Sequence, residues 1–278
     1  MKYKLIAIDI DGTFLNDKHN VTEGNLSAIK KAADKGIKLV ICSARIPTSL
    51  KMLKKYIPEH QPIIAGNGSI ILDDNHKEIY SQPLEKDIVL EIISMLKEDF
   101  EDILYSFLNN VNVYIEEVKT ETINFFKTIN DRLPREEGVQ FCIIKDSIKY
   151  IEENHIKVLK ISIYENNSLD LLQEVRKKLK KFNEIEIVGA GIAGMEISHK
   201  GANKGTSLEI LAKHYGYTLG DCIAIGNDKN DLEMIKMAGV GVAVKNAKES
   251  LKQAADYVTK RDNNNNAVAE VIENFIED

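Results

Sequence analysis

The chain has 278 residues, a length that favours two domains of ordinary size over one compact core. Hydrophobic residues make up 44% and charged residues 29%, which is typical of a globular protein with a solvated surface. The formal net charge of −6 argues against a general nucleic-acid binder, because neutralising phosphates requires a basic face. No apolar run is long enough for a membrane span, and the N-terminal stretch runs into carboxylates too soon for a signal peptide.

The three cysteines, Cys42, Cys142 and Cys222, lie in or beside apolar runs and show no metal-ligand spacing. We interpret them as small buried hydrophobic residues. An odd number without a pairing pattern fits a reducing compartment, so we expect a cytoplasmic protein.

The first part of the chain alternates short apolar runs with amphipathic segments. The predicted elements are strands at 5–8, 37–42 and 62–65, helices at 22–35 and 49–56, and a hairpin joining 70–72 to 78–80. Thr22 is a plausible N-cap of the first helix, and Gly36 is a plausible stop. Continuous apolar strands between helices are typical of a parallel sheet covered on both faces.

The pattern changes after Pro83 and returns near residue 189. Between them we predict helices at 84–100 and 169–182 and strands at 111–115 and 158–164. After them we predict helices at 206–215, 231–238, 247–255 and 267–275 and strands at 221–225, 241–244 and 257–259. The sequence therefore predicts a doubly wound α/β core, formed by 1–83 and 189–278, with an inserted α+β domain at 84–188.

The run Gly189–Gly194 matches the spacing G-x-G-x-x-G of a dinucleotide-binding loop. Such a loop must lead from a strand into a helix, whereas Met195–Ser198 alternates like a strand. The acidic residue expected about 20 positions further on, at the end of a second strand, is also missing. We therefore interpret this run as a glycine-rich linker between the inserted domain and the core.

Polar side chains follow several of the predicted core strands, where ligands collect in open α/β sheets. They come from five segments: Asp9 and Asp11; Ser43; Asn67; Lys204, which opens a helix; and Asn227, Asp228 and Asp231. This set suits phosphoryl transfer, because a carboxylate that attacks a charged phosphate monoester needs a hard cation, a lysine and hydrogen-bond donors around it. A second carboxyl two residues away can protonate the leaving group and later activate water.

These residues carry a family resemblance. Asp9–Thr13 resembles the first motif of the haloacid dehalogenase superfamily, and Ser43 in Ile41–Arg45 resembles the second. Lys204 in Lys200–Gly205 resembles the third motif, and Gly226–Asp231 resembles the fourth. The long insertion between the second and third motifs is similar to the cap of the Cof-type phosphatases.

The resemblance implies a role for each position. Asp9 would be the nucleophile, and Asp11 the general acid and base. Ser43, Ala44 and Lys204 would bind the phosphoryl group, and the cofactor would be Mg²⁺. The implied metal ligands are Asp9, the main-chain carbonyl of Asp11, Asn227, Asp228 and Asp231. Arg45 could contact the substrate or pair with a carboxylate, and Asn67 could orient the substrate or cap a turn.

The chain departs from the family pattern at three places. Asn227 stands where an aspartate is usual, so Asn227 or the neighbouring Asp228 could be the direct metal ligand. Ala44 replaces a glycine, and Asn265–Ala267 replaces Asp-Gly-Val, a change expected to affect the shape of a loop.

The leading hypothesis is a Mg²⁺-dependent phosphatase that acts on a small phosphorylated metabolite, such as a sugar phosphate, pyridoxal phosphate or flavin mononucleotide, through an aspartyl-phosphate on Asp9. A phosphomutase on the same core and a non-catalytic sensor of phosphorylated ligands are the alternatives. The expected partner is the small substrate, and neither nucleic acid nor membrane is expected. The basic run Arg176–Lys181 is most simply the solvated face of a helix.

Overall fold

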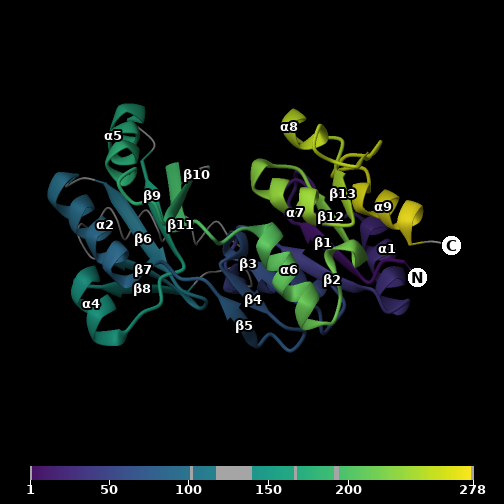
Figure 1. Ribbon diagram of the computed structural model, residues 1–278, viewed down its shortest axis with the longest axis horizontal. Coiled ribbons are helices and arrows are strands. Elements are labelled where there is room, and N and C mark those ends of the chain that lie inside the picture. The colour runs from purple at the N-terminus through teal and green to yellow at the C-terminus, as the bar shows by residue number, and fades with distance from the viewer. Residues whose placement is uncertain (1, 101–102, 117–139, 166–167, 191–193, 277–278) are drawn as a thin grey trace. The chain divides into compact units, whose positions relative to one another are not determined.

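The computed structural model describes residues 2–100, 103–116, 140–165, 168–190 and 194–276 (Figure 1). The chain separates into two compact units. The core unit consists of Met1–Arg45, Leu53–Ser81 and Ala202–Asp278, and the inserted unit of Ile46–Met52 and Gln82–Gly201.

The core unit is built on an eight-stranded sheet in the order β14-β13-β12-β1-β2-β3-β4-β5. The strands are β1 (Leu5–Asp9), β2 (Lys38–Cys42), β3 (Ile63–Ala65), β4 (Ile70–Leu72), β5 (Glu78–Ser81), β12 (Cys222–Gly226), β13 (Val240–Ala243) and β14 (Tyr257–Val258). Pairing is parallel from β14 to β3 and antiparallel from β3 through β4 to β5. All five residues of β1 are buried, as expected for a strand covered on both faces.

Helices cover both faces of this sheet. They are α1 (Glu23–Asp34), α6 (Lys204–His214), α7 (Leu232–Met237), α8 (Glu249–Lys252) and α9 (Ala267–Phe275), with short 3₁₀ helices η2 (Gly66–Gly68), η4 (Leu219–Asp221) and η5 (Lys229–Asp231). The connections β1–α1–β2 and β12–α7–β13 run in opposite directions along the sheet, so right-handed crossovers put α1 and α7 on opposite faces. Accordingly α1 packs with α9, and α6 packs with α7 (Figure 1).

The two directions of winding meet at β1. The chain leaves β1 toward β2 on one side, whereas β12 pairs with β1 on the other side and leads away to β13. Such a reversal opens a crevice at the carboxyl ends of the strands, which is where α/β sheets bind their ligands. Asp9 is the last residue of β1 and therefore lies at this point.

The inserted unit has a six-stranded sheet in the order β10-β11-β9-β6-β7-β8. Its elements are α2 (Lys86–Asp99), β6 (Leu104–Leu108), β7 (Asn112–Glu116), β8 (Gln140–Ile144), α4 (Ser147–Asn154), β9 (Lys160–Tyr164), α5 (Leu169–Leu179), β10 (Ile185–Ala190) and β11 (Gly194–His199). The 3₁₀ helix η1 (Pro47–Lys55) belongs to this unit only as far as Met52. One hydrophobic cluster joins α2, α4 and α5 to alternate residues of the strands, such as Tyr105 and Phe107. All three helices therefore cover one face of this sheet (Figure 1).

The predicted fold class, an α/β core with an inserted α+β unit, is confirmed. The predicted linker at Gly189–Gly194 is wrong, because Gly189 pairs with Met195 and both lie in the β10–β11 hairpin of the inserted unit; residues 191–193 fall outside the described part. The core unit resumes at Ala202, whereas the sequence suggested residue 189. The predicted helix at 49–56 is a 3₁₀ helix. Among the described residues, no helix combines the length and apolar character needed to cross a membrane.

Candidate active site

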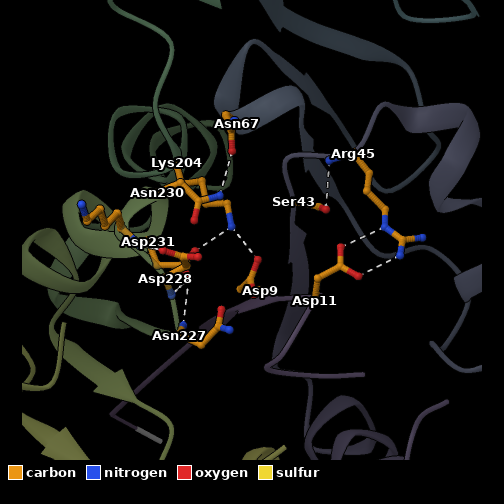
Figure 2. Close-up of polar contacts among 11 residues, drawn as sticks. Asp9, Asp11, Ser43, Arg45, Asn67, Lys204, Asn227, Asp228, Asn230 and Asp231 are labelled. Atoms are coloured by element: carbon orange, nitrogen blue, oxygen red, sulfur yellow. Dashed lines mark hydrogen bonds and ion pairs between the residues drawn. The ribbon is translucent and has the colours of Figure 1, made fainter. Parts of the chain in front are cut away.

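Asp9 lies at the centre of a buried group of charges at the end of β1. The ammonium of Lys204 is 2.6 Å from Oδ1 of Asp9 and 2.6 Å from Oδ1 of Asp231 (Figure 2). Asp9 is 6% exposed, and the other two are fully buried. Lys204 is the first residue of α6, where the side chain of Asn203 caps the helix by accepting a hydrogen bond from Thr206 N–H.

Burial shapes the electrostatics of this group. Burial, followed by the charge of Asp231, raises the pKa of Asp9 to about 7, although Lys204 opposes the shift. Burial alone would disfavour the ammonium form of Lys204, but the charges of Asp231 and Asp9 outweigh it and raise the lysine pKa. When Asp9 is ionised, two carboxylates share one ammonium, and one negative charge is left in a place with little water.

Asp11 follows in a tight turn. Phe14 and Leu15 donate main-chain hydrogen bonds back to the carbonyl of Ile10, and Gly12 has the left-handed φ of +81° that the turn requires. The carboxylate of Asp11 accepts two hydrogen bonds from Arg45, 2.9 Å from Nε and 2.7 Å from the terminal nitrogen (Figure 2). Of the two interpretations of Arg45, the structure shows the pairing with a carboxylate.

The loops after β2 and β3 are joined to each other. The hydroxyl of the buried Ser43 accepts a hydrogen bond from Arg45 N–H at 3.1 Å, and half-buried Ala44 lies between them. The main-chain N–H of Asn67 donates to the carbonyl of Ser43 at 3.0 Å. Asn67 has a left-handed φ of 58°, and its side-chain oxygen accepts a hydrogen bond from Asn230 at 2.9 Å. This side chain therefore links the β3–β4 turn to the fourth motif.

The fourth-motif loop is organised by Asp231. Its Oδ2 accepts hydrogen bonds from the main-chain N–H groups of Asn227 and Asp228, at 2.9 and 3.0 Å. The close approach requires a glycine at position 226, because a Cβ there would lie 2.5 Å from Cγ of Asp231. Asp231 is thus bound through both oxygens, to Lys204 on one side and to its own loop on the other.

Asn227 and Asp228 have different surroundings. A Cβ added at Gly12 would lie 2.3 Å from Nδ2 of Asn227, so the amide packs directly against the turn that carries Asp11. Asp228 instead accepts from Lys229 N–H and forms a 2.6 Å ion pair with Lys248, which outweighs partial burial and lowers the pKa of its carboxyl. Of the two candidate ligands, Asn227 is the one that contacts the turn.

The donors at this edge of the sheet fit magnesium, a hard cation that takes carboxylate, carbonyl and amide oxygens. The carboxylate of Asp9, the main-chain carbonyl of Asp11 and the amide of Asn227 supply these oxygen types, and the uncompensated charge of the Asp9–Asp231 pair favours a cation. No group of three or more His, Cys, Asp or Glu side chains placed to hold a metal occurs in the described ranges. A site here therefore depends on main-chain and amide oxygens as well as carboxylates.

The structure brings Asp9, Lys204 and Asp231 into direct contact and pairs Asp11 with Arg45, while Asp228 faces Lys248. Three contacting residues were missed from the sequence: Asn230, Asn246 and Lys248. Asn230 lies inside the fourth motif and could have been chosen there. Asn246 and Lys248 follow β13. They would have been chosen from the sequence if the residues after this strand had also been considered, because ligands collect beyond the carboxyl ends of strands in α/β sheets.

Comparison with known proteins gives the same family at three levels. Residues 6–272 match the model of the haloacid dehalogenase-like hydrolase family. A putative phosphatase of Haemophilus influenzae is 30% identical over 98% of both chains. The 5-amino-6-(5-phospho-D-ribitylamino)uracil phosphatase YcsE of Bacillus subtilis is 29% identical over 98% of this chain and 96% of its own.

Solved structures agree. A haloacid dehalogenase-like hydrolase from Bacteroides thetaiotaomicron superimposes with a TM-score of 0.82 at 26% identity, over 99% of this chain and all of the other. The predicted family and enzyme class, a hydrolase of the haloacid dehalogenase superfamily in its Cof-type form, are confirmed. This chain belongs to the haloacid dehalogenase-like hydrolases.

Proposed function

We propose that this hydrolase is a Mg²⁺-dependent phosphatase of small phosphorylated metabolites and that Asp9 is its nucleophile. The observation that carries the proposal is the buried Asp9–Lys204–Asp231 group at the carboxyl end of β1, where the winding of the sheet reverses. A carboxylate in this position can meet a bound phosphate, and the adjacent ammonium offsets the charge that accumulates when the two approach.

The reaction then has two steps. An oxygen of Asp9 attacks phosphorus, the bond from phosphorus to the leaving oxygen breaks, and the carboxyl of Asp11 gives its proton to that oxygen. Asp11 then takes a proton from water, whose oxygen attacks the phosphorus of the aspartyl-phosphate; inorganic phosphate departs and the Asp9 carboxylate is restored. Lys204 stays charged throughout, because Asp231 holds it beside Asp9.

Three oxygens would hold the magnesium ion: a carboxylate oxygen of Asp9, the carbonyl of Asp11 and the amide oxygen of Asn227. When bound, the ion supplies positive charge that screens the phosphate from the nucleophile. Asp231 would not bind the ion directly, because its two oxygens already accept hydrogen bonds from Lys204 and from the loop of Asn227. It would instead hold the Asn227 loop in place. Asp228 is proposed to act only through its pair with Lys248.

The remaining positions fit phosphate binding and orientation of the acid. The Ser43 hydroxyl and the main chain at Ala44 would bind phosphate oxygens at the end of β2. Arg45 would orient Asp11 through its two hydrogen bonds, one of which must open when Asp11 carries the proton that it donates. Asn67 is proposed to support the loop that carries Asn230 and to lie outside the substrate contacts.

The relatives support a phosphorylated metabolite as the substrate. Their names include the ribitylaminouracil phosphatase of Bacillus subtilis and an HMP-PP phosphatase of Yersinia pseudotuberculosis, 26% identical over 90% of this chain. We propose that the inserted unit selects the leaving group. The three free cysteines support a reducing compartment, and we propose the cytoplasm.

The test is hydrolysis of a panel of phosphate monoesters, including a simple aryl phosphate, with and without magnesium. We expect metal-dependent release of phosphate, lost by roughly 10³-fold or more in Asp9→Asn. Asp34→Asn, at the exposed end of α1, is the matched control and should retain full activity. Full activity in Asp9→Asn would show that Asp9 is not the nucleophile. Saturable binding of the esters by the wild-type chain without turnover would favour a sensor instead.

A further inference from the structure

A short loop after β13, residues 244–248, contacts both loops that carry the candidate metal donors. Its N–H groups at Val244 and Lys248 donate to the carbonyls of Gly226 and Asn227, at 3.1 and 2.9 Å. The Lys248 side chain adds the ion pair with Asp228. The 244–248 loop is therefore fixed to the fourth motif at three points.

The same loop reaches the first motif through one side chain. Nδ2 of Asn246 donates to the carbonyl of Gly12 at 2.8 Å, while its Oδ1 accepts from the main-chain N–H of Asn263 at 3.1 Å. Only this orientation of the amide satisfies both partners, because a flipped amide would set oxygen against carbonyl and N–H against N–H. The amide therefore has one defined position between the two segments.

Asn263 strengthens the same connection. It is 2% exposed, and its Nδ2 donates to the carbonyl of Leu15 at 3.1 Å and to Asp17 at 3.0 Å. The turn that begins at Asp9 is thus held at Gly12 by Asn246 and at Leu15 by Asn263. Both holding residues lie more than two hundred positions away along the chain.

We propose that Asn246 is a positioning residue for the magnesium site, which makes this inference dependent on the proposed function. Gly12 packs against the amide of Asn227, and the Asp11 carbonyl belongs to the peptide that precedes Gly12, so a small shift of Gly12 changes the separation between that carbonyl and Asn227. Asn246 fixes Gly12 through the carbonyl of the following peptide, and its loop also fixes Asn227. One loop therefore sets the spacing of donors that come from two motifs.

The test is direct binding of Mn²⁺, which takes the same oxygen ligands. The electron paramagnetic resonance signal of free Mn²⁺ measures how much of the ion is unbound. Removing an outer hydrogen-bond partner of a metal site typically weakens binding 10- to 100-fold. We expect Asn246→Ala to raise the Mn²⁺ Kd about tenfold. This is the lower end of that range, because Asn246 acts on the metal donors indirectly, through the main chain of Gly12. Aryl phosphate hydrolysis should need correspondingly more magnesium, while kcat at saturating magnesium stays within about twofold of the wild type.

Asn265→Ala is the matched control, since Asn265 is another exposed asparagine and its side chain donates to Asp262 within its own loop. It should leave the Kd unchanged. Asn246 is exposed, so both variants should unfold at the wild-type temperature without metal. Equal Kd values in both variants and the wild type would overturn the inference while leaving the metal site intact. A parallel fall in unfolding temperature would make Asn246 a general structural residue, which also overturns it. A wild-type chain that binds no Mn²⁺ would overturn the metal site and this inference together.

Discussion

At the scale of single residues, the most consequential contact is the one between Lys204 and its two carboxylates. The sequence suggested Lys204 and Asp9 as parts of one site, because both stand at strand or helix ends of an α/β core. It could not show that Asp231 would share the ammonium, since that depends on where η5 turns after β12. The contact is buried, so its loss should affect folding as well as chemistry.

We expect Lys204→Met to lower the free energy of unfolding by about 3–5 kcal/mol without metal, because it leaves two buried carboxylates unpaired. Adding Asp231→Asn should recover part of the loss by removing one of the two charges. Urea unfolding measures both. Lys213→Met, on the exposed face of the same helix, is the control and should change stability little. A change below about 1 kcal/mol in Lys204→Met would contradict this electrostatic account.

The pair between Arg45 and Asp11 should behave differently, because the carboxylate is about half exposed at 47%. We expect Arg45→Ala to change stability by less than about 1 kcal/mol. Its kcat/KM should nevertheless fall about tenfold, since Asp11 loses the fork that orients it. Arg45→Lys keeps the charge without the fork and should recover little. Recovery to the wild-type rate in the lysine variant would show that charge, and not orientation, is what Arg45 supplies.

Among the helices and strands, those whose ends are set by neighbouring residues were predicted correctly. The helix at 22–35 ends before Gly36, whose φ is +82°, and the helix at 267–275 has the predicted bounds. Asn266 adopts a left-handed φ of 66°, a conformation that glycine adopts easily and asparagine tolerates. Strands β6 and β8 and helix α4 were missed, because short mixed runs in the inserted unit lack a clear period.

Two of those missed elements, β6 and α4, meet at one buried carboxylate, Glu116, at the end of β7. It accepts hydrogen bonds from Lys97 on α2, Tyr105 on β6 and the N–H of Ser147 on α4, at 2.7, 2.8 and 2.8 Å. Burial opposes its charge, but these donors outweigh burial and lower its pKa. The unfolded chain therefore binds a proton more readily than the folded one, so this contribution to stability is lost as the pH falls below about 4.3.

We expect Glu116→Gln to lower the free energy of unfolding at neutral pH by about 1–3 kcal/mol, through loss of charge-assisted hydrogen bonds. The variant should also lose less of its remaining stability than the wild type between about pH 5 and pH 3. Urea unfolding across this range provides the measurement. Glu153→Gln, on the exposed side of α4, should follow the wild-type curve. Identical acid sensitivity in Glu116→Gln and the wild type would show that Glu116 is not a source of it.

At the scale of the whole molecule, the sequence predicted a core interrupted by an insertion but misjudged where the insertion ends. Glycines near 189 suggested a linker, whereas β11 continues the inserted sheet to His199 and pairs with both β10 and β9. Pairing between distant strands leaves no local signal, so the alternating pattern of Met195–Ser198 identified a strand without identifying its sheet.

We therefore expect a fragment of residues 82–201 to unfold cooperatively and a fragment of residues 84–188 to remain unfolded. The shorter piece lacks β11, which lies between β10 and β9, so the sheet would lose its connection to β10. Circular dichroism during urea unfolding distinguishes them. Cooperative unfolding of the shorter fragment would mean that β11 is dispensable and that the inserted unit ends earlier than its sheet suggests.

During turnover, Asp9 should carry the phosphoryl group. The most direct measurement is acid quenching of the working enzyme with an aryl phosphate and magnesium, followed by peptide mass spectrometry. The expected result is one added phosphoryl group on Asp9, absent from Asp9→Asn and from enzyme quenched before substrate is added. Steady turnover with an unmodified Asp9 under conditions that preserve acyl-phosphates, or the phosphoryl group on another residue, would show that Asp9 is not the nucleophile.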